Sequence, residues 1–174
     1  MAPQLTYEDY VRLPSDRRWE VIGGAAYAVP SPSADHQRIA FLIGRRIAEH
    51  LDAYGGGEIF VAPLDVVLDD DEIVQPDLIF VAADDTATVG RDVRGAPAWV
   101  IEVVSDAVRD KLVKRDLYLR FGVREYWAVD LDLRIVEIYR PDEAPRVVDA
   151  SGRAVARTLP GFEIEVAEIF RDLR

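Results

Sequence analysis

The segment Trp99-Val100-Ile101-Glu102-Val103-Val104 decides the fold class of this chain, because it is apolar on both of its alternating faces. A strand with this pattern is covered on both sides of its sheet. Glu102 interrupts the apolar run. A buried carboxylate is costly unless a metal ion, an ion-pair partner or a shifted pKa compensates for its lost hydration. The segment therefore predicts a central buried strand and a polar site that meets it.

On either side of this segment, strand-like and helix-like patterns alternate. Glycine and proline clusters separate them, such as Gly23-Gly24 between two short runs and Pro30-Ser31-Pro32-Ser33 before a long amphipathic stretch. The alternation predicts a single mixed α/β domain over residues 1–174. In chain order we expect a helix at 6–12, a hairpin of 18–22 and 25–29, a helix at 34–54, strands at 59–68 and 78–81, a loop at 84–97, the Glu102 strand, a helix at 106–121, strands at 126–129 and 135–139, and a last helix near 165–172.

Length and composition are typical of a folded chain without thiol chemistry. Of the 174 residues, 49% are hydrophobic and 30% are charged, which predicts a soluble domain with a substantial core. No apolar stretch reaches membrane-spanning length, because Asp77 and Glu102 interrupt the best candidates. The first residues lack the pattern of a secretory signal, so the expected location is the cytoplasm. The absence of cysteine excludes disulfides and thiolate metal sites.

The charge of the chain is acidic overall but uneven. The formal net charge is −11, which opposes non-specific attraction to nucleic acid. Residues 105–125 differ from the rest, with six basic residues against four acidic ones. This stretch is compatible both with a solvated helix face and with a face that contacts phosphates.

Two carboxylates and a lysine form the candidate site. Asp77 follows Pro76 at the start of an apolar strand, and Glu102 lies in a second apolar strand 25 residues later. In the helix expected next, Asp110, Lys114 and Tyr118 share one face at i, i+4 and i+8. If the strands are neighbours, both carboxylates point into one cleft below that helix. Two hard oxygen ligands with water and a substrate phosphate suit Mg²⁺ or Mn²⁺, and a lysine would stabilise the charged groups.

This arrangement resembles the PD-(D/E)XK nuclease superfamily and, more closely, the Uma-two family of restriction-endonuclease-like bacterial proteins. The resemblance covers most of the chain and depends on the order and spacing of several motifs. They are Trp19-Glu20-Val21-Ile22-Gly23-Gly24, His36, Val74-Gln75-Pro76-Asp77-Leu78-Ile79-Phe80-Val81, Ile101-Glu102-Val103-Val104-Ser105, Asp110, Lys114, Tyr118, Gly122-Val123-Arg124-Glu125-Tyr126-Trp127-Ala128-Val129-Asp130 and Leu159-Pro160-Gly161-Phe162.

The resemblance implies a restriction-endonuclease-like core, in which helices flank a central mixed β-sheet and a β-hairpin precedes it. It also implies a metal-dependent endonuclease that acts on DNA. Asp77 and Glu102 would bind Mg²⁺ or Mn²⁺, with the carbonyl of Val103 as a further ligand. Lys114 would stabilise charge at the scissile phosphate. Glu20 would complete the metal shell from the hairpin, His36 would transfer a proton or contact the substrate, and a homodimer would suit the cutting of both strands.

One departure from the superfamily pattern concerns the lysine. Val104 stands two positions after Glu102, where the superfamily motif has lysine. In the family that the chain resembles, a lysine of the next helix replaces it, and Lys114 has that position here. The start of that helix carries Asp106 where proline is common in the family, which puts the placement of Lys114 in question.

Each site residue also has a structural interpretation. Glu102 and Lys114 form a buried ion pair in that interpretation. Asp77 caps a turn, and His36 and Glu20 are surface residues.

Two other functions therefore stay open. One is a non-catalytic module that keeps the nuclease fold for binding or assembly, which the acidic charge and Val104 favour. The other is a glycosidase with paired carboxylates, which needs neither metal nor lysine. Exposed aromatic platforms for a sugar are not identifiable in the sequence.

Overall fold

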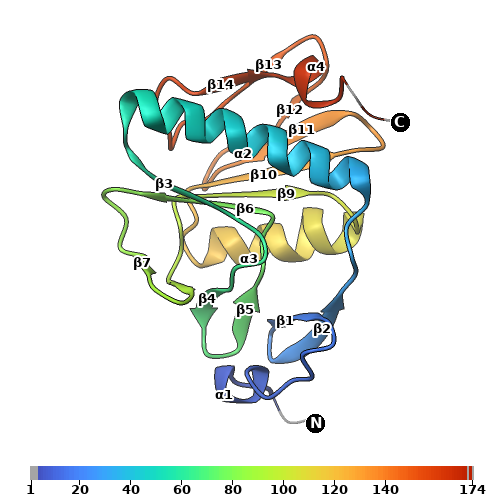
Figure 1. Ribbon diagram of the computed structural model, residues 1–174, viewed down its shortest axis with the longest axis vertical. Helices are drawn as coiled ribbons and strands as arrows, with labels where there is room; N and C mark the ends of the chain where they lie inside the picture. The colour runs from blue at the N-terminus through green and yellow to red at the C-terminus, as the bar shows by residue number, and fades with distance from the viewer. Residues whose placement is uncertain (1–3, 172, 174) are drawn as a thin grey trace.

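The computed structural model describes residues 4–171 and 173 and shows a sheet between two helical layers (Figure 1). Long helix α2 covers one face of this sheet. A π-helix, η1, continues into α3 and covers the other face. The helices are α1 (Tyr7–Tyr10), α2 (Ala34–Tyr54), η1 (Arg109–Lys114), α3 (Arg115–Arg120) and α4 (Val166–Ile169).

The strands form two larger sheets and a small C-terminal pair. In spatial order the central sheet contains β12 (Arg146–Val148), β11 (Ile135–Tyr139), β10 (Glu125–Asp130), β9 (Trp99–Val103), β6 (Leu78–Ala82) and β3 (Gly57–Val61). The second sheet contains β2 (Ala25–Val29), β1 (Arg18–Ile22), β5 (Glu72–Val74), β4 (Val66–Asp69), β8 (Val93–Arg94) and β7 (Thr88–Val89). The C-terminal pair is β13 (Arg153–Val155) with β14 (Glu163–Glu165).

Strand β9 lies inside the central sheet, as its sequence predicts. All five of its residues are buried. It pairs in parallel with β10 and antiparallel with β6. A parallel pair requires a crossover, and the η1–α3 segment supplies it. The expected central mixed sheet flanked by helices is therefore confirmed.

The alternation along β9 directs its side chains into two separate cores. Trp99 and Ile101 belong to the core beneath α2. Val100 belongs to the core beneath α3, together with Leu117. Because successive side chains of a strand point to opposite faces, Glu102 lies on the same face as Val100. The crossover helix is thus the element that meets Glu102.

Several predicted elements agree with the structure. The hairpin has the expected bounds, and Gly23 and Gly24 adopt φ values of 58° and 71° at its turn. Thr6 caps α1 in a reciprocal arrangement with Asp9. The side chain of Ser33 accepts a hydrogen bond from the first turn of α2, which spans 34–54 as expected. Local capping and turn chemistry therefore determine these boundaries.

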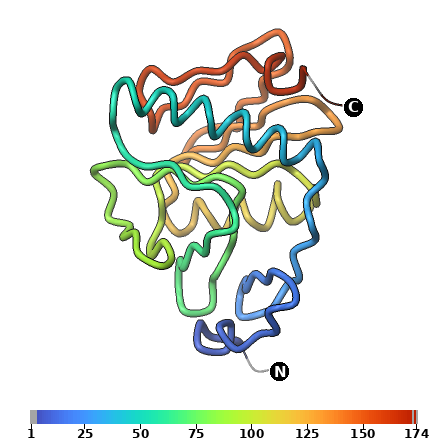
Figure 2. The backbone as a smooth tube through the Cα atoms, viewed as in Figure 1, coloured from blue at the N-terminus to red at the C-terminus, as the bar shows by residue number. Residues whose placement is uncertain are grey.

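The strand expected at 59–68 is wrong. The chain forms β3 and β4 instead, and these belong to different sheets. Pro63 lies between them and has no N–H to donate to a sheet ladder, so the strand ends before it. In Figure 2 the chain passes here from the central sheet to the second sheet, which lies nearer the N-terminus. This break brings the N-terminal hairpin next to the central sheet.

Three smaller differences concern the loop and the later helices. The loop expected at 84–97 contains the short strands β7 and β8. The helix expected at 106–121 begins at Ala107, and its Arg109–Lys114 segment is a π-helix. The last helix is shorter than the expected 165–172, and residue 172 lies outside the described residues.

No helix within the described residues combines the length and the apolar character needed to cross a membrane.

Candidate functional site

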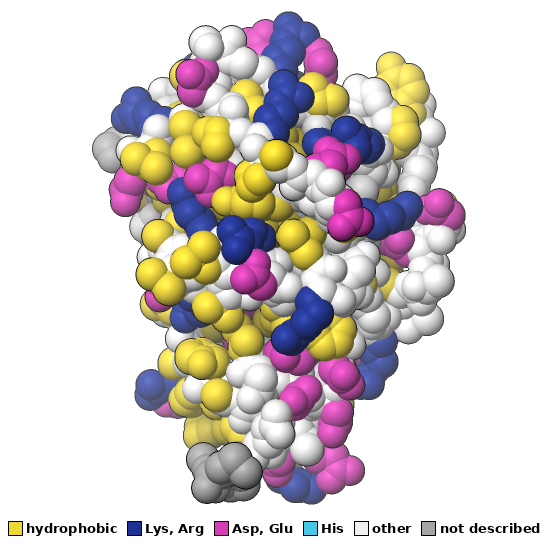
Figure 3. Space-filling view, turned by 180° about the vertical axis from the view of Figure 1, so that it is seen from behind, with side chains coloured by type: hydrophobic (Ala, Val, Ile, Leu, Met, Phe, Trp, Pro, Cys, Tyr) yellow, Lys and Arg dark blue, Asp and Glu magenta, His cyan; other side chains and the backbone are white. Residues whose placement is uncertain are grey.

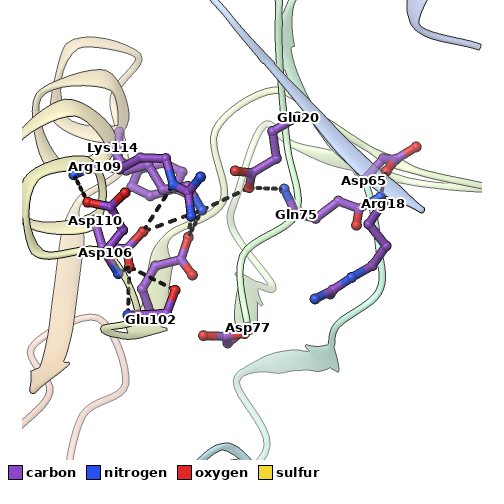
Figure 4. A network of polar contacts seen from close by, with 12 residues as sticks. Arg18, Glu20, Asp65, Gln75, Asp77, Glu102, Asp106, Arg109, Asp110 and Lys114 are labelled. Atoms are coloured by element: carbon purple, nitrogen blue, oxygen red, sulfur yellow. Dashed lines mark hydrogen bonds and ion pairs between the residues drawn. The ribbon is translucent and has the colours of Figure 1, made fainter. Parts of the chain in front are cut away.

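Asp77 and Glu102 lie at facing positions of two neighbouring strands. The antiparallel register pairs Leu78 of β6 with Ile101 of β9, and its extension by one residue sets Asp77 opposite Glu102. Directly opposite residues point to the same face of a sheet. Both side chains line one cavity of about 270 Å³. The geometry expected from the sequence, with two carboxylates in one cleft, is therefore present (Figure 4).

Glu102 is buried, with 4% of its surface exposed. Its Oε1 accepts hydrogen bonds from Lys114 Nζ at 2.9 Å and from Tyr118 Oη at 2.9 Å. Burial raises the pKa of Glu102 to about 8, although the charge of Lys114 acts in the opposite direction. The carboxylates of Asp77 and Glu20 add to the increase. The surroundings of Glu102 therefore contain too little positive charge to stabilise its ionised form.

Lys114 projects from η1 between several carboxylates. Its Nζ lies 2.8 Å from Glu20 Oε1, 2.9 Å from Glu102 Oε1 and 4.0 Å from Asp110 Oδ1. Burial opposes its charge, but Glu102, Glu20 and Asp110 together outweigh that effect and raise the pKa of Lys114. The ammonium group is therefore charged across the physiological range.

The π-helix positions these side chains. Tyr126 Oη of β10 donates a hydrogen bond of 2.7 Å to the carbonyl of Asp110 within η1. Irregular helical turns of this kind are frequent at functional sites. Asp110, Lys114 and Tyr118 are all buried on the side facing Glu102, as their spacing predicts. The π-helical hydrogen bonding therefore still allows Asp110, Lys114 and Tyr118 to face Glu102, as the sequence predicted.

Asp110 organises the loop before η1. Its Oδ2 accepts hydrogen bonds of 2.9 Å from the backbone N–H groups of Ser105 and Asp106. These contacts support the chain where it leaves β9 and carries Asp106 in place of proline. The carboxylate thus has a structural role that the sequence spacing does not reveal.

Glu20 reaches the site from the second sheet. It lies in β1 and is fully buried. Its Oε1 contacts Lys114 and accepts a hydrogen bond of 2.9 Å from the backbone N–H of Gln75. Its Oε2 is buried without a hydrogen-bond partner. The surface interpretation of Glu20 is therefore wrong, because the second sheet packs this side chain against η1.

His36 contacts Asp77 from the first turn of α2. The distance between His36 Nε2 and Asp77 Oδ2 is 3.0 Å. The same oxygen accepts a hydrogen bond of 2.8 Å from the backbone N–H of Val103. His36 Nδ1 is buried without a partner. His36 is 6% exposed, so the interpretation of it as a surface residue is also wrong. These contacts hold one oxygen of Asp77 and leave Oδ1 for another partner.

Two arginines line the same cavity and were not singled out as site residues by the sequence. They are Arg18 of β1 and Arg109 of η1. Arg109 Nε is buried without a hydrogen-bond partner and lies 3.8 Å from Asp110 Oδ1. Arg18 lies two residues before Glu20 in the same strand, so both side chains point to the same face. This alternation was the sequence pattern from which Arg18 could have been predicted as a site residue. The cavity therefore presents cationic groups beside its carboxylates.

The donor set fits a hard divalent cation with few protein ligands. Within residues 4–171 and 173, no group of three His, Cys, Asp or Glu side chains converges to hold a metal ion. Asp77 and Glu102 offer two carboxylates, and Val103 also lines the cavity. Mg²⁺ commonly uses one or two carboxylates and keeps several waters. The unpartnered Glu20 Oε2 and the raised pKa of Glu102 also indicate a deficit of positive charge.

Charged side chains of both signs lie on the face opposite to the view of Figure 1. On the face seen in Figure 3, acidic and basic side chains are interspersed, and the basic ones do not gather into a stripe. A broad cationic surface for duplex DNA is therefore not a feature of that face.

The mixed sheet, the flanking helices and the facing carboxylates with a helix-borne lysine define a restriction-endonuclease-like protein. The profile of the Uma2 family, described as "Putative restriction endonuclease", matches residues 7–167, and the chain belongs to this family.

A solved structure supports the fold. It is a crystal structure of "a putative nuclease belonging to DUF820" from Anabaena variabilis ATCC 29413. The two chains are 20% identical, the similarity covers 96% of this chain and 98% of the other, and the TM-score is 0.83. A search of curated proteins found no match.

Proposed function

We propose that this protein is a metal-dependent endonuclease that hydrolyses phosphodiester bonds in DNA. The observation that carries the proposal is the facing pair Asp77 and Glu102 in one cavity, with the lysine of the following helix bonded to Glu102. Membership of a family described as "Putative restriction endonuclease" supports the same chemistry.

Asp77 and Glu102 are the proposed ligands of Mg²⁺ or Mn²⁺, with the carbonyl of Val103. The hydrogen bonds of the two carboxylates fall on Asp77 Oδ2 and Glu102 Oε1, so Oδ1 and Oε2 are the proposed ligand atoms. When bound, the ion supplies a Lewis acid for the phosphate and lowers the pKa of a water molecule. Lys114 holds Glu102 in place and adds positive charge at the cavity wall.

The remaining residues orient these groups and the substrate. His36 fixes Asp77 through the 3.0 Å contact, in which the Nε2–H donates to Asp77 Oδ2. Glu20 fixes Lys114 from the opposite side. Arg18 and Arg109 line the cavity and are suited to phosphate oxygens, because a guanidinium binds phosphate through paired N–H groups.

A cleavage assay on plasmid and single-stranded DNA with Mg²⁺ or Mn²⁺ tests the proposal. We expect Asp77→Asn and Glu102→Gln each to lower the rate by at least about a hundredfold, because each removes a ligand charge. Glu163→Gln changes an exposed carboxylate of β14 and is the matched control. Circular dichroism verifies the fold of each variant. Equal rates in all the proteins would overturn the proposal.

A non-catalytic binding module is the second candidate. The observation that favours it is the engagement of Lys114 by both Glu20 and Glu102, which ties up the only lysine of the cavity wall among the described residues. Calorimetric titration with Mn²⁺ separates the two functions. Metal binding that Glu102→Gln abolishes supports the nuclease, whereas no binding by a correctly folded protein supports the module.

A further inference from the structure

A second cavity of about 300 Å³ lies beside the candidate site. It combines aromatic rings with guanidinium groups, and its principal residues are Tyr7, Tyr10, Trp19, Arg17, Arg18 and Arg91. Arg18 and Gln75 line both this cavity and the one that contains Asp77 and Glu102. In Figure 4 the side chain of Arg18 extends toward Asp77. The two cavities are therefore neighbours with a shared wall.

The aromatic rings of the second cavity are held in fixed orientations. Tyr7 Oη donates a hydrogen bond of 2.8 Å to Asp92 Oδ2, and Tyr10 Oη donates one of 2.7 Å to Asp65 Oδ1. Trp19 Nε1 donates 2.9 Å to the carbonyl of Pro14. All three aromatic residues are only partly buried. Rings that are positioned in advance bind a planar ligand without the cost of ordering them.

Arginines outnumber carboxylates along the wall of this cavity, three to two. Arg18 and Arg91 have no ion-pair partner within the part of the chain that the structure describes. Two carboxylates line the same cavity, but Asp92 is paired with Arg94 at 2.9 Å and Asp65 already accepts two hydrogen bonds. Unpaired arginines beside partly exposed aromatic rings are typical of sites for single-stranded nucleic acid, where bases stack and phosphates meet cations.

Gln75 lines both cavities, and its side-chain oxygen has no hydrogen-bond partner. Its backbone N–H donates a hydrogen bond to Glu20. Its Nε2 donates hydrogen bonds of 2.7 Å to Asp65 and 3.2 Å to Tyr10 Oη. Because the Asp65 carboxylate can only accept, the amide orientation is determined chemically. Gln75 Oε1 is then buried without a partner, which is unfavourable unless a ligand donates to it. The N–H groups of a nucleobase are suitable donors.

We propose that this second cavity binds a base of a single-stranded nucleic acid next to the phosphate held at Asp77 and Glu102. Trp19 and Tyr10 provide the stacking surface, Arg18 contacts the intervening phosphate, and Gln75 Oε1 accepts from the base. The position of the phosphate rests on the proposed function, whereas the binding of the base does not. Bases inside an intact duplex are stacked and paired, so the preferred ligand is a single strand or an unpaired end.

Tryptophan fluorescence during titration with oligodeoxythymidylate tests the proposal. The chain contains three tryptophans, and Trp99 and Trp127 are fully buried, so quenching by a stacked base reports on Trp19. The protein of residues 1–174 is titrated in EDTA, which prevents metal-dependent cleavage. We expect quenching, and an affinity lower by roughly five- to a hundredfold in Trp19→Leu, measured by fluorescence anisotropy of a labelled strand. Trp19→Phe keeps a stacking surface and should bind nearly as well as the unchanged protein.

Two comparisons make the result decisive. A blunt duplex of the same sequence should bind more weakly and should not quench Trp19, and Gln75→Leu should weaken single-strand binding. Equal affinities of Trp19→Leu and the unchanged protein, or the absence of quenching, would overturn the base subsite. An oligouridylate arm shows whether RNA binds by the same chemistry, and its binding with Trp19 quenching also supports the subsite.

The outcome is separable from that of the proposed function. If Glu102→Gln and the unchanged protein bind the single strand with Trp19 quenching but neither cleaves DNA with Mg²⁺ or Mn²⁺, the base subsite stands and the nuclease proposal fails. If the unchanged protein cleaves DNA while Trp19→Leu binds and cleaves single strands equally well, the nuclease proposal stands and the base subsite fails.

Discussion

Two glutamates on neighbouring strands of the central sheet are both buried, yet their surroundings differ. Glu125 opens β10 and is fully buried, and Glu102 lies near the end of β9 with 4% exposed. Both oxygens of Glu125 are satisfied. Oε1 accepts from Trp127 Nε1 and Arg140, and Oε2 accepts from the backbone N–H groups of Arg157 and Thr158 and from the Thr158 hydroxyl.

Glu102 has no such complete set of donors. Its hydrogen bonds fall on one oxygen, and it shares Lys114 with Glu20. Glu125 has an arginine at 2.8 Å as well as donors that connect β10 to the C-terminal segment. The difference indicates that donors matched to the charge stabilise the fold, whereas a shortage of donors leaves a carboxylate ready to bind a proton or a cation.

The largest expected effect concerns stability at the satisfied glutamate. Glu125→Ala should lower the free energy of unfolding by about 3–5 kcal/mol, because it removes the acceptor of five hydrogen bonds and the close partner of a largely buried Arg140, which keeps only the longer 3.9 Å contact with Glu143. Urea unfolding followed by circular dichroism measures the loss. Glu102→Gln is the comparison and should change stability far less, since its site already lacks positive charge. Similar losses in the two variants would contradict the distinction between the two regions.

The second expected effect concerns the cation of the candidate site. Lys114→Met should lower the free energy of unfolding by about 3 kcal/mol at pH 8, because it leaves the carboxylates of Glu20 and Glu102 without a cation. The loss should be smaller at pH 5, where Glu102 is protonated because its pKa is about 8. Urea unfolding at the two pH values measures the difference. A loss that does not change with pH would show that the two carboxylates do not depend on Lys114.

Local sequence predicts much of the fold and of the candidate site, but not all of it. The apolar run around Glu102, the start of β6 after Pro76 and the glycine turn of the hairpin are local signals, so the strands and the facing carboxylates could be predicted. The approach of Glu20 to Lys114 joins two sheets across a long separation in the chain, and only the family resemblance pointed to it.

Two further features, the division of the strand expected at 59–68 and the π-helix after β9, could not be predicted from the apolar pattern alone. The apolar pattern of 59–68 suggested one strand, but Pro63 cannot donate to a ladder and the strand divides there. Helical periodicity predicts a helix after β9 but does not distinguish a π-helix from an α-helix, because the buried positions are nearly the same over one turn. Arg18 and Gln75 form a wall between the two cavities. This wall depends on how the two sheets pack, so only the three-dimensional structure reveals it.

The third expected effect is a pH dependence of metal binding. The folded pKa of Glu102, about 8, lies above its ordinary value of 4.5, so the stabilisation from its proton is present at low pH and is lost as pH rises toward 8. A divalent cation competes with that proton. The affinity for Mn²⁺ should therefore rise by about tenfold per pH unit from 6 to 8 and level off above 8. Calorimetric titration measures it, and an affinity that is flat over this range would contradict Glu102 as a ligand.

The smallest expected effect compares one hydrogen-bond donor from each region. Tyr118→Phe removes a donor to Glu102, and Thr158→Val removes a donor to Glu125 without a large change in volume. Each should cost about 1 kcal/mol of stability or less, because other donors remain. Only Tyr118→Phe should alter metal binding, since loss of a hydrogen bond to the ionised form raises the pKa of Glu102 further and moves the rise in Mn²⁺ affinity to higher pH. If Thr158→Val moved that rise equally, the two glutamates would belong to one coupled network, and the shortage of donors at Glu102 would not be a local property of the site.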